Sequence, residues 1–167
     1  LTTLDRVVDH HGRELSFTYN LDGRIDTMTD PGGGVTLYSY SAVGNLIEVV
    51  QPDDTPLDPA DNPSRVYHYD DAYRPQALTG ITDENGERFA TWWYDPQDRA
   101  VASEHALGTR HTEMRYDTVG RTTTVETAEG SVQELTFDYV AGKLRLVSAD
   151  GERCSACGGN AKATTYD

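Results

Sequence analysis

The sequence predicts an all-β protein built from repeated antiparallel β-hairpins that form a curved sheet. A tyrosine-led motif recurs along the chain, apolar and polar residues alternate just before each of its tyrosines, and turn-forming segments separate the copies. Alternation with a period of two is typical of a β-strand, and regularly spaced turn signals are typical of hairpins. Helices with scattered aromatic residues are the alternative. The segments are too short for helices, and they are rich in Thr, Val and Tyr, which favour strands.

The motif appears as YNLDGR, YSAVGN, YDDAYR, YDPQDR and YDTVGR, with a shortened copy, YVAGK, and a final YD. Its leading tyrosines recur at intervals of 21 to 29 residues, which indicates one supersecondary unit used many times. The longest interval contains a segment rich in Pro and Asp, at 52–63, which we interpret as an insertion loop. The leading tyrosines are Tyr19, Tyr40, Tyr69, Tyr94, Tyr116, Tyr139 and Tyr166.

The first strand of each predicted unit ends at the leading tyrosine. Two positions before it stands a large apolar residue, and the residue between them is usually polar, with Trp93 as the exception. We expect this pair of large residues to share one face of the sheet and to pack on neighbouring hairpins. The Arg that follows is expected to pair with the Asp after the tyrosine or to stack on a ring. The apolar residues are Phe17, Tyr38, Tyr67, Trp92, Met114 and Phe137.

A turn and a second strand follow each tyrosine. NLDG, SAVG and DTVG place a glycine where a positive φ is expected, whereas DDAY and DPQD must use another residue. The second strands, RIDTM, NLIEVV, RAVAS, RTTTVE and KLRLVS, alternate imperfectly, which predicts a bulge near the turn. Second turns are predicted at DPGGG, DENG, ALG, AEG and ADG (149–151), so that successive units form a long antiparallel meander.

The chain is strongly acidic, and this limits its partners. It has 28 acidic and 14 basic residues, for a net charge of −14. A nucleic-acid-binding face needs clustered Lys and Arg, so the sequence predicts no nucleic-acid partner and no docking on anionic lipid. No apolar run approaches the length of about 18 residues that indicates a membrane span.

The segments YDTVGRTTTVETAEG (116–130) and YNLDGRIDTMTDPGG (19–33) resemble the YD-repeat family, also called Rhs repeats. The family motif is approximately Tyr-Asp-x-x-Gly-Arg, followed by an apolar strand and a second Gly turn. The resemblance covers nearly the whole chain and implies that 1–167 is a YD-repeat region. It also implies that the sheet is part of a YD-repeat β-shell. In bacterial Rhs proteins and in the BC component of Tc toxins, such a shell encloses a C-terminal toxin domain.

The resemblance therefore implies a structural wall segment and no enzyme, with no cofactor. Its expected partners are the remainder of its own shell and an encapsulated toxin domain. Its expected location is secreted or at the bacterial cell surface, after synthesis in the cytoplasm. With 167 residues the chain is too short to close a shell. We therefore expect a fragment of a longer chain, whose open strand edges favour an edge-to-edge homodimer.

The alternative function is an extracellular YD-repeat module that binds carbohydrate or protein. Trp92 and Trp93 are adjacent, so on a strand they point to opposite faces, and one of them is a candidate exposed aromatic platform.

Cys154 and Cys157, in a predicted loop at 151–160, are the candidate metal ligands. Their C-x-x-C spacing is that of half a zinc site, but the nearest histidine, His111, lies 43 residues before Cys154 and no second pair exists. Three interpretations stay open: free thiols in a turn, a disulfide or half of a metal site completed elsewhere, and a redox site. No catalytic residue is predicted, because the Ser and Thr residues lie in no nucleophile elbow.

The histidines and the acidic loop give further expectations. His10 and His11 are adjacent and should point to opposite faces if they lie on a strand, and His68 should face outward. His105 and His111 flank the ALGT turn and could approach each other as a metal-binding pair. The carboxylates of the insertion loop at 52–63 could suit calcium, but they lack the Gly and the terminal Glu of an EF-hand. A solvated loop is the simpler interpretation.

Overall fold

The computed structural model describes residues 3–53, 61–152 and 164–165, and these residues are almost entirely β-strands and the turns that join them. The one helical segment among them is a short 3-10 turn, η1 (Ala106–Gly108). The predicted all-β class is confirmed. The chain divides into two units, Leu1–Phe89 and Ala90–Asp167.

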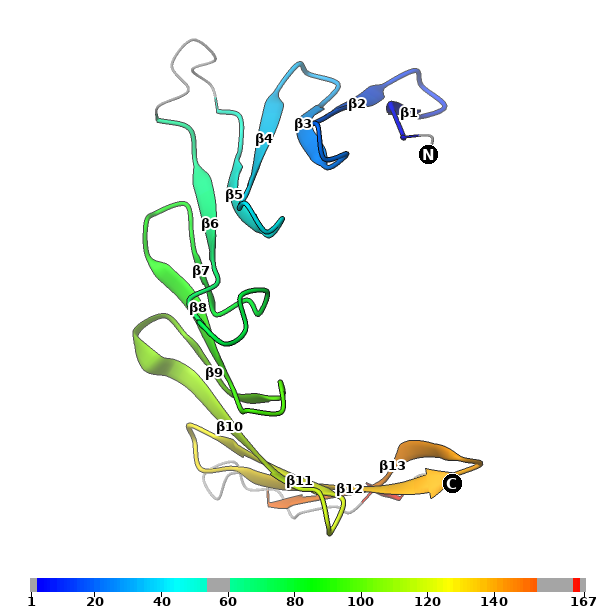
Figure 1. Ribbon diagram of the computed structural model, residues 1–167, viewed down its shortest axis with the longest axis vertical. Helices are drawn as coiled ribbons and strands as arrows, with labels where there is room; N and C mark the ends of the chain where they lie inside the picture. Colours follow the sequence, from blue (N-terminus) through cyan, green and yellow to red (C-terminus); the bar gives the residue numbers. More distant parts are fainter. Residues whose placement is uncertain (1–2, 54–60, 153–163, 166–167) are drawn as a thin grey trace. The chain divides into compact units, whose positions relative to one another are not determined.

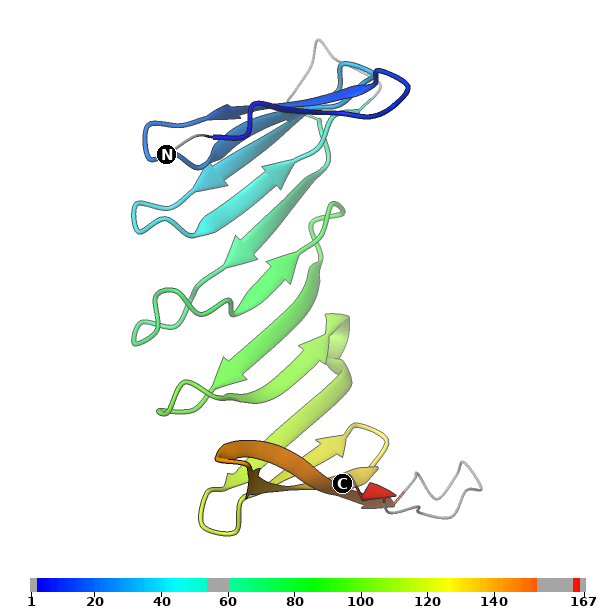
Figure 2. The same cartoon turned by 90° about the vertical axis from the view of Figure 1, so that its right-hand side faces the viewer.

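Unit 1 is an antiparallel meander. Each strand pairs with the strand before it and the strand after it in the chain. Successive turns therefore lie at opposite ends of the strands (Figures 1 and 2). Figure 1 shows the sheet of this unit, in blue to green, as open and curved. Its strands are β1 (Arg6–Val8), β2 (Glu14–Tyr19), β3 (Ile25–Thr29), β4 (Val35–Tyr40), β5 (Leu46–Val50), β6 (Ser64–His68) and β7 (Gly80–Thr82).

Unit 2 has the same topology and longer strands toward its end. The boundary between the units falls within β8 (Arg88–Tyr94), and the strands that follow again pair in chain order. They are β9 (Ala100–His105), β10 (Thr109–Asp117), β11 (Thr122–Thr127), β12 (Val132–Val140), β13 (Lys143–Glu152) and β14 (Thr164–Thr165).

The predicted bulges lie at the leading tyrosines. The pairing register shifts between Thr18 and Tyr19, between Ser39 and Tyr40, and between Trp93 and Tyr94. In each hairpin one residue of the second strand is left without a partner, so the sequence leaves its strict alternation there. At Tyr116 the register is unbroken, because Tyr116 pairs with Thr123 and Asp117 with Thr122.

The turn glycines follow the prediction in part. Gly23 and Gly44 have φ values of +76° and +88°, and in DPQD the left-handed residue is Asp98 at +62°. The prediction is wrong for DTVG, because Arg121 adopts the positive φ of +55° in place of Gly120. This turn has no register shift, and the left-handed residue stands one position later.

The predicted turn at ADG (149–151) is also wrong. These residues lie inside β13, and Gly151 pairs with Gln133 of β12. A Cβ at Gly151 would lie 3.1 Å from the carbonyl oxygen of Val132. This glycine therefore allows a close approach of two strands and does not form a turn.

The sheet of each unit is a single layer. Among the described residues only Thr36, Gly80 and Ala90 are buried, and most strand residues are half-buried. Stability must come from contacts along the sheet between neighbouring hairpins, since no second layer covers a core. No helix in the described part of the chain has the length and apolar character needed to cross a membrane.

Candidate functional site: the contacts between successive repeats

The turn after Tyr94 is held by the carboxylate of Asp95. Its Oδ1 accepts hydrogen bonds from the backbone N–H groups of Gln97 and Arg99, at 2.9 and 3.0 Å. The N–H of Asp95 donates to the carbonyl oxygen of Arg99, and the N–H of Asp98 donates to the carbonyl oxygen of Asp95. One side chain thus satisfies backbone donors that a tight turn would otherwise leave to water.

The same scheme recurs in unit 1. Asn20 accepts from the N–H groups of Asp22 and Arg24, both at 3.0 Å, and Asp83 accepts from Asn85 and Glu87 at 3.0 and 3.1 Å. Asp, Asn and Ser share a short side chain with an acceptor oxygen, which is the property that the turn requires. The turns built this way begin at Asp9, Asn20, Asp30, Asp83 and Asp95, and a reduced version begins at Ser41.

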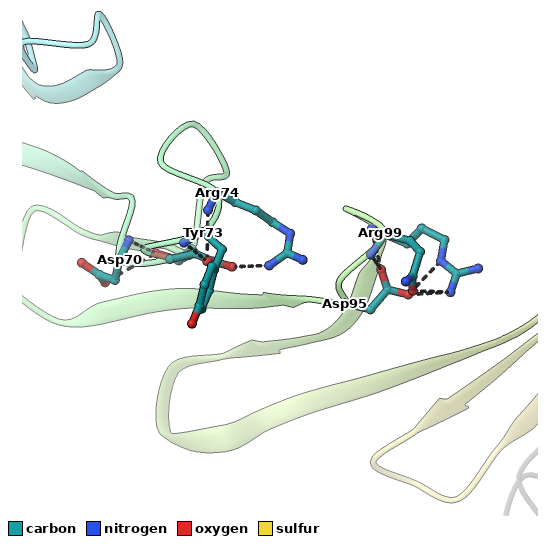
Figure 3. A network of polar contacts seen from close by, with 8 residues as sticks. Asp70, Tyr73, Arg74, Asp95 and Arg99 are labelled. Atoms are coloured by element: carbon teal, nitrogen blue, oxygen red, sulfur yellow. Dashed lines mark hydrogen bonds and ion pairs between the residues drawn. The ribbon is translucent and has the colours of Figure 1, made fainter.

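The arginine at the end of the turn pairs with the capping carboxylate. In Figure 3 the guanidinium of Arg99 lies beside Asp95, with Nη2 2.6 Å and Nε 2.8 Å from Oδ2. The hydrogen bond from Arg99 is the main cause that holds the pKa of Asp95 below its ordinary value. The pKa of Asp9 is lowered in the same way by Arg13. The predicted pairing of Arg with the Asp after the tyrosine is therefore correct at Asp95.

The same arginine also lies over the tyrosine of the next repeat. The Cζ of Arg99 is 4.4 Å from the ring centroid of Tyr116. Arg24 lies over Tyr40 at 5.7 Å, and Arg121 lies over Tyr139 at 5.9 Å. A guanidinium within about 6 Å of an aromatic face is attracted by it. Each of these three contacts connects a repeat to the one that follows. The predicted stacking of the arginine on a ring is therefore correct at these positions, but the sequence analysis did not say that the ring belongs to the next repeat.

Glycine makes room for one of these contacts. A Cβ at Gly44 would overlap the guanidinium of Arg24, which lies over this turn and over the ring of Tyr40. At Gly23 a Cβ would meet nothing within 4 Å. Gly44 therefore has two roles, a positive φ and space for the arginine of the preceding repeat, whereas Gly23 has the first role alone.

Hydrogen bonds from hydroxyl and backbone N–H groups connect a repeat to the hairpin before it. The hydroxyl of Tyr19 donates to the carbonyl oxygen of Leu4 at 2.8 Å, and that of Tyr116 donates to Ala100 at 2.6 Å. The N–H of Phe137 donates to the carbonyl oxygen of Arg121 at 2.9 Å. Tyr116 is thus held at its hydroxyl by the preceding hairpin and on its ring by Arg99 of that hairpin.

The segment after Tyr69 departs from the scheme. The carboxylate of Asp71 accepts from the backbone N–H of Tyr73 and pairs with Arg74 at 2.9 Å; Figure 3 shows Tyr73 and Arg74. Both side chains of this ion pair are largely buried. The hydrogen bond from Arg74 is the main cause that lowers the pKa of Asp71. Arg88 donates to the carbonyl oxygen of Thr79 at 3.0 Å, and its guanidinium occupies the space that a side chain at Gly80 would need.

The predicted histidine sites are only partly as expected. His68 is half-buried and bonds to Thr82 across β6 and β7 at 2.8 Å. Its outward orientation stays a prediction. His10 and His11 lie in a turn with ring centroids 3.7 Å apart, so they do not point to opposite faces. His111 lies near Glu104 and Glu113, at 3.4 and 3.5 Å.

The structure does not test the predicted metal sites. Cys154 and Cys157 lie outside the described residues, as does most of the insertion loop at 52–63. Among the residues that are described, no group of three or more His, Cys, Asp or Glu side chains is arranged to hold a metal ion.

A hollow of about 550 Å³ lies beside the arginine–tyrosine contacts of unit 2. Phe137, Tyr139 and Leu144 form much of its lining, and Arg99 and Arg121 lie at its wall. Both guanidinium groups are already in ion pairs, Arg99 with Asp95 and Arg121 with Asp138. The hollow is therefore lined as a packing surface between hairpins.

Comparison with known proteins agrees with this geometry. Residues 19–56, which contain the first two tyrosine turns, match the family model of the RHS Repeat. No curated protein matches the chain. Two solved structures share its fold at 15% identity: the Tc holotoxin pore of Photorhabdus luminescens with a mutation in TccC3, at a TM-score of 0.53, and TcdB2-TccC3-Cdc42, at 0.52.

The alignments cover 92% and 93% of this chain but only 9% of each of those chains. At this identity the likeness concerns the fold alone. The tyrosine pattern and the turns agree with the family match, which identifies an RHS repeat at residues 19–56.

Proposed function

We propose that the chain is a non-catalytic wall segment of an RHS-repeat shell, with the repeat region extending over 1–167. The observation that carries the proposal is the single-layer sheet of each unit, whose stability rests on contacts between successive hairpins. Such a sheet can be extended by adding hairpins without enlarging a core, which is the property that a wall requires.

We further propose that the shell encloses a C-terminal toxin domain and is exported from a bacterium or displayed at its surface. The similarity to the fold found in Tc toxin structures supports this, as does the acidic charge of −14, which keeps an extended surface soluble. The partners are then the rest of the shell and the enclosed domain.

The test uses the complete gene product that contains this segment. Cryo-electron microscopy should show a hollow shell with these hairpins in its wall, and a protease should spare the enclosed domain until the shell is opened with denaturant. A C-terminal domain that is cleaved as quickly in the intact particle as after opening would contradict enclosure. A compact particle without an interior would contradict the wall itself.

A specific observation supports a second candidate, a binding module for carbohydrate or protein. Trp93 on β8 is 41% exposed, and its ring lies 6.3 Å from that of His111. An exposed indole beside a polar ring is a surface on which a sugar can stack. Binding on a glycan array that Trp93→Ala removes, and that Trp92→Phe keeps, would favour this candidate. An array without signal for the parent chain would exclude carbohydrate.

We also propose that an open strand edge can associate with a second copy. β1 pairs with β2 on one side, and among the described residues no strand pairs with its other side. Val7 and Val8 on β1 are about half exposed. An unpaired strand edge with apolar side chains is a template for pairing with another chain.

A further inference from the structure

Asn85 and Gly86 lie in the turn that joins β7 to β8, and both are exposed. A Cβ built at Gly86 would meet nothing within 4 Å. An asparagine followed by glycine can cyclise, because the backbone nitrogen of the glycine can attack the side-chain carbonyl carbon of the asparagine without hindrance from a side chain of its own. The turn therefore presents a chemically reactive pair to solvent.

The other asparagines in the described part of the chain are held against this reaction. The Oδ1 of Asn20 accepts two backbone N–H groups of its turn, and the Nδ2 of Asn45 donates to a backbone carbonyl oxygen. Both are followed by leucine, and Asn62 is followed by Pro63, which has no N–H to lose. Among the described residues, none forms a hydrogen bond with the side chain of Asn85, whose backbone N–H alone is bonded.

From these observations we propose that Asn85 is a site of spontaneous deamidation. The nitrogen of Gly86 loses its proton to hydroxide and attacks Cγ of Asn85. A bond forms between this nitrogen and Cγ, the bond from Cγ to the side-chain nitrogen breaks, and ammonia leaves. Water then opens the cyclic imide. Cleavage of the new bond gives aspartate, and cleavage of the original peptide bond gives isoaspartate, in which the main chain runs through Cβ and Cγ.

The turn that begins at Asn20 indicates that the fold accepts the aspartate product. Its backbone hydrogen bonds are those of the turn at Asp83, and Asp22 stands where Asn85 does. Asp22 also precedes a glycine, but its carboxylate is paired with Arg24 at 3.1 Å. An ionised carboxylate resists attack by a nucleophile, whereas the neutral amide of Asn85 does not. The reaction therefore distinguishes two turns of the same geometry.

The isoaspartate product does not fit this turn, because it adds a carbon to the main chain between the nitrogens of Asn85 and Gly86. Three hydrogen bonds span the added carbon. The N–H of Gly86 donates to the carbonyl oxygen of Asp83 at 3.0 Å, and the N–H of Asp83 donates to that of Glu87 at 2.9 Å. The N–H of Glu87 donates to Oδ1 of Asp83 at 3.1 Å. Isoaspartate here therefore opens the turn between β7 and β8.

The inference goes beyond the proposed wall function, because it requires neither a shell nor an enclosed domain. The turn belongs to the irregular repeat that begins at Tyr69, in which β7 has 3 residues. A slow covalent change at this turn would limit the lifetime of the hairpin, while the turns capped by Asn20 and Asp95 would stay intact.

The experiment follows each asparagine by peptide mapping with mass spectrometry, in the folded 167-residue chain and in the chain unfolded in guanidinium chloride, both at mildly alkaline pH. Attack on Asn85 must first open the hydrogen bond of the Gly86 N–H. We expect Asn85 to convert at most about tenfold more slowly in the folded chain, a factor that corresponds to about 1.4 kcal/mol. Asn20 and Asn45 should be slowed far more by folding.

Two results would overturn the proposal. One is a folded chain that keeps Asn85 intact long after the unfolded chain has converted it. The other is a folded chain in which Asn45 converts faster than Asn85. Conversion should also become faster as the pH rises, since the backbone nitrogen of Gly86 must lose its proton, and a rate that does not depend on pH would contradict this reaction.

The effect on the turn is tested with Asn85→Asp and Asn85→Gln. The first variant has the new charge without the added carbon, and its Tm should equal that of the fresh parent. The second needs a larger ring to cyclise, so its Tm should not change with age. The Tm of the aged parent should fall by a few degrees as isoaspartate accumulates, measured with an isoaspartyl methyltransferase. An unchanged Tm at high isoaspartate content, or an equal fall in Asn85→Gln, would show that the turn does not open.

Discussion

The repeat that begins at Tyr94 and the repeat that begins at Tyr69 both join a capped turn to the strands that follow, but they do so through different contacts. After Tyr94, Asp95 caps the turn and pairs with Arg99, which lies over the ring of Tyr116 in the next repeat. After Tyr69 the ion pair of Asp71 and Arg74 is kept, but the chain between them and β7 is longer. There Arg88 lies against Gly80 and donates to Thr79.

The difference separates what the repeat requires from what it tolerates. Both segments keep a carboxylate that accepts backbone N–H groups and pairs with an arginine. They differ in the contact that reaches the next strands, which an aromatic ring provides in one case and a glycine with backbone carbonyls provides in the other. We infer that a short side chain with an acceptor oxygen, which is a carboxylate in these two repeats, is the constant element, and that the surface on which an arginine packs can vary.

Removing a capping carboxylate should have the largest effect. Asp95→Ala leaves the N–H groups of Gln97 and Arg99 without their acceptor and Arg99 without its ion pair, and should lower the Tm by on the order of 5 °C. Asp95→Asn should cost about half as much, since Asn20 makes the same backbone bonds. Thermal unfolding measures both, and equal losses would show that the acceptor geometry contributes nothing.

Glycine substitutions should separate backbone strain from arginine packing. Gly44→Ala should cost about 2 kcal/mol of unfolding free energy, because it adds a displaced Arg24 to the cost of a left-handed alanine. Gly23→Ala should cost about 1 kcal/mol, since space there is open. Urea denaturation compares the two variants. If Gly23→Ala is as costly as Gly44→Ala, the packing of Arg24 on this turn is unimportant.

The irregular repeat should respond to a different glycine. Gly80→Ala should displace the guanidinium of Arg88 from Thr79 and cost about 1.5 kcal/mol. In an Arg88→Ala background the same change should cost little, because the space is then empty. A full cost in that background would place the strain in the backbone of β7.

Much of the fold could be predicted because the sequence patterns are local. The tyrosine spacing, the period of two and the turn residues indicated the hairpins, their order and the bulges at Tyr19, Tyr40 and Tyr94. The two errors in the turns depend on pairing between strands. Arg121 takes the left-handed position because the hairpin at Tyr116 has no bulge, and Gly151 lies in a strand because β12 and β13 are long.

The contacts between repeats were harder to predict. The pairing of Asp95 with Arg99 followed from their separation of four residues. The contact of Arg99 with Tyr116 joins residues 17 positions apart, and it depends on how far apart successive hairpins lie. A search for an arginine in each turn followed by a tyrosine one repeat later could have found it, since three copies of the pattern make the contact.

The smallest effect should be a pH dependence that distinguishes the two repeats. Burial, followed by the charge of Arg88, lowers the pKa of His68 below 6.5, so the folded state favours the neutral imidazole. The unfolded chain binds the proton first, and stability should fall as the pH drops through about 6.5. The lowered pKa values of Asp71 and Asp95 act in a separate window, where stability is lost as the pH falls below about 4.

His68→Gln should remove the loss near pH 6.5 and keep the loss below pH 4. Urea midpoints measured from pH 7.5 to 3.5 for the parent and the variant would check this. A variant that still loses stability near pH 6.5 would place the proton on another group.

The central claim is that an arginine of one repeat stabilises the tyrosine of the next. The most direct test is a double-mutant cycle of Arg99→Ala and Tyr116→Leu, with unfolding free energies from urea denaturation. The cycle removes the separate cost of the Asp95 ion pair and leaves the interaction between the two side chains. We predict a coupling energy of about 1 kcal/mol. Costs that simply add, with no coupling, would contradict the account.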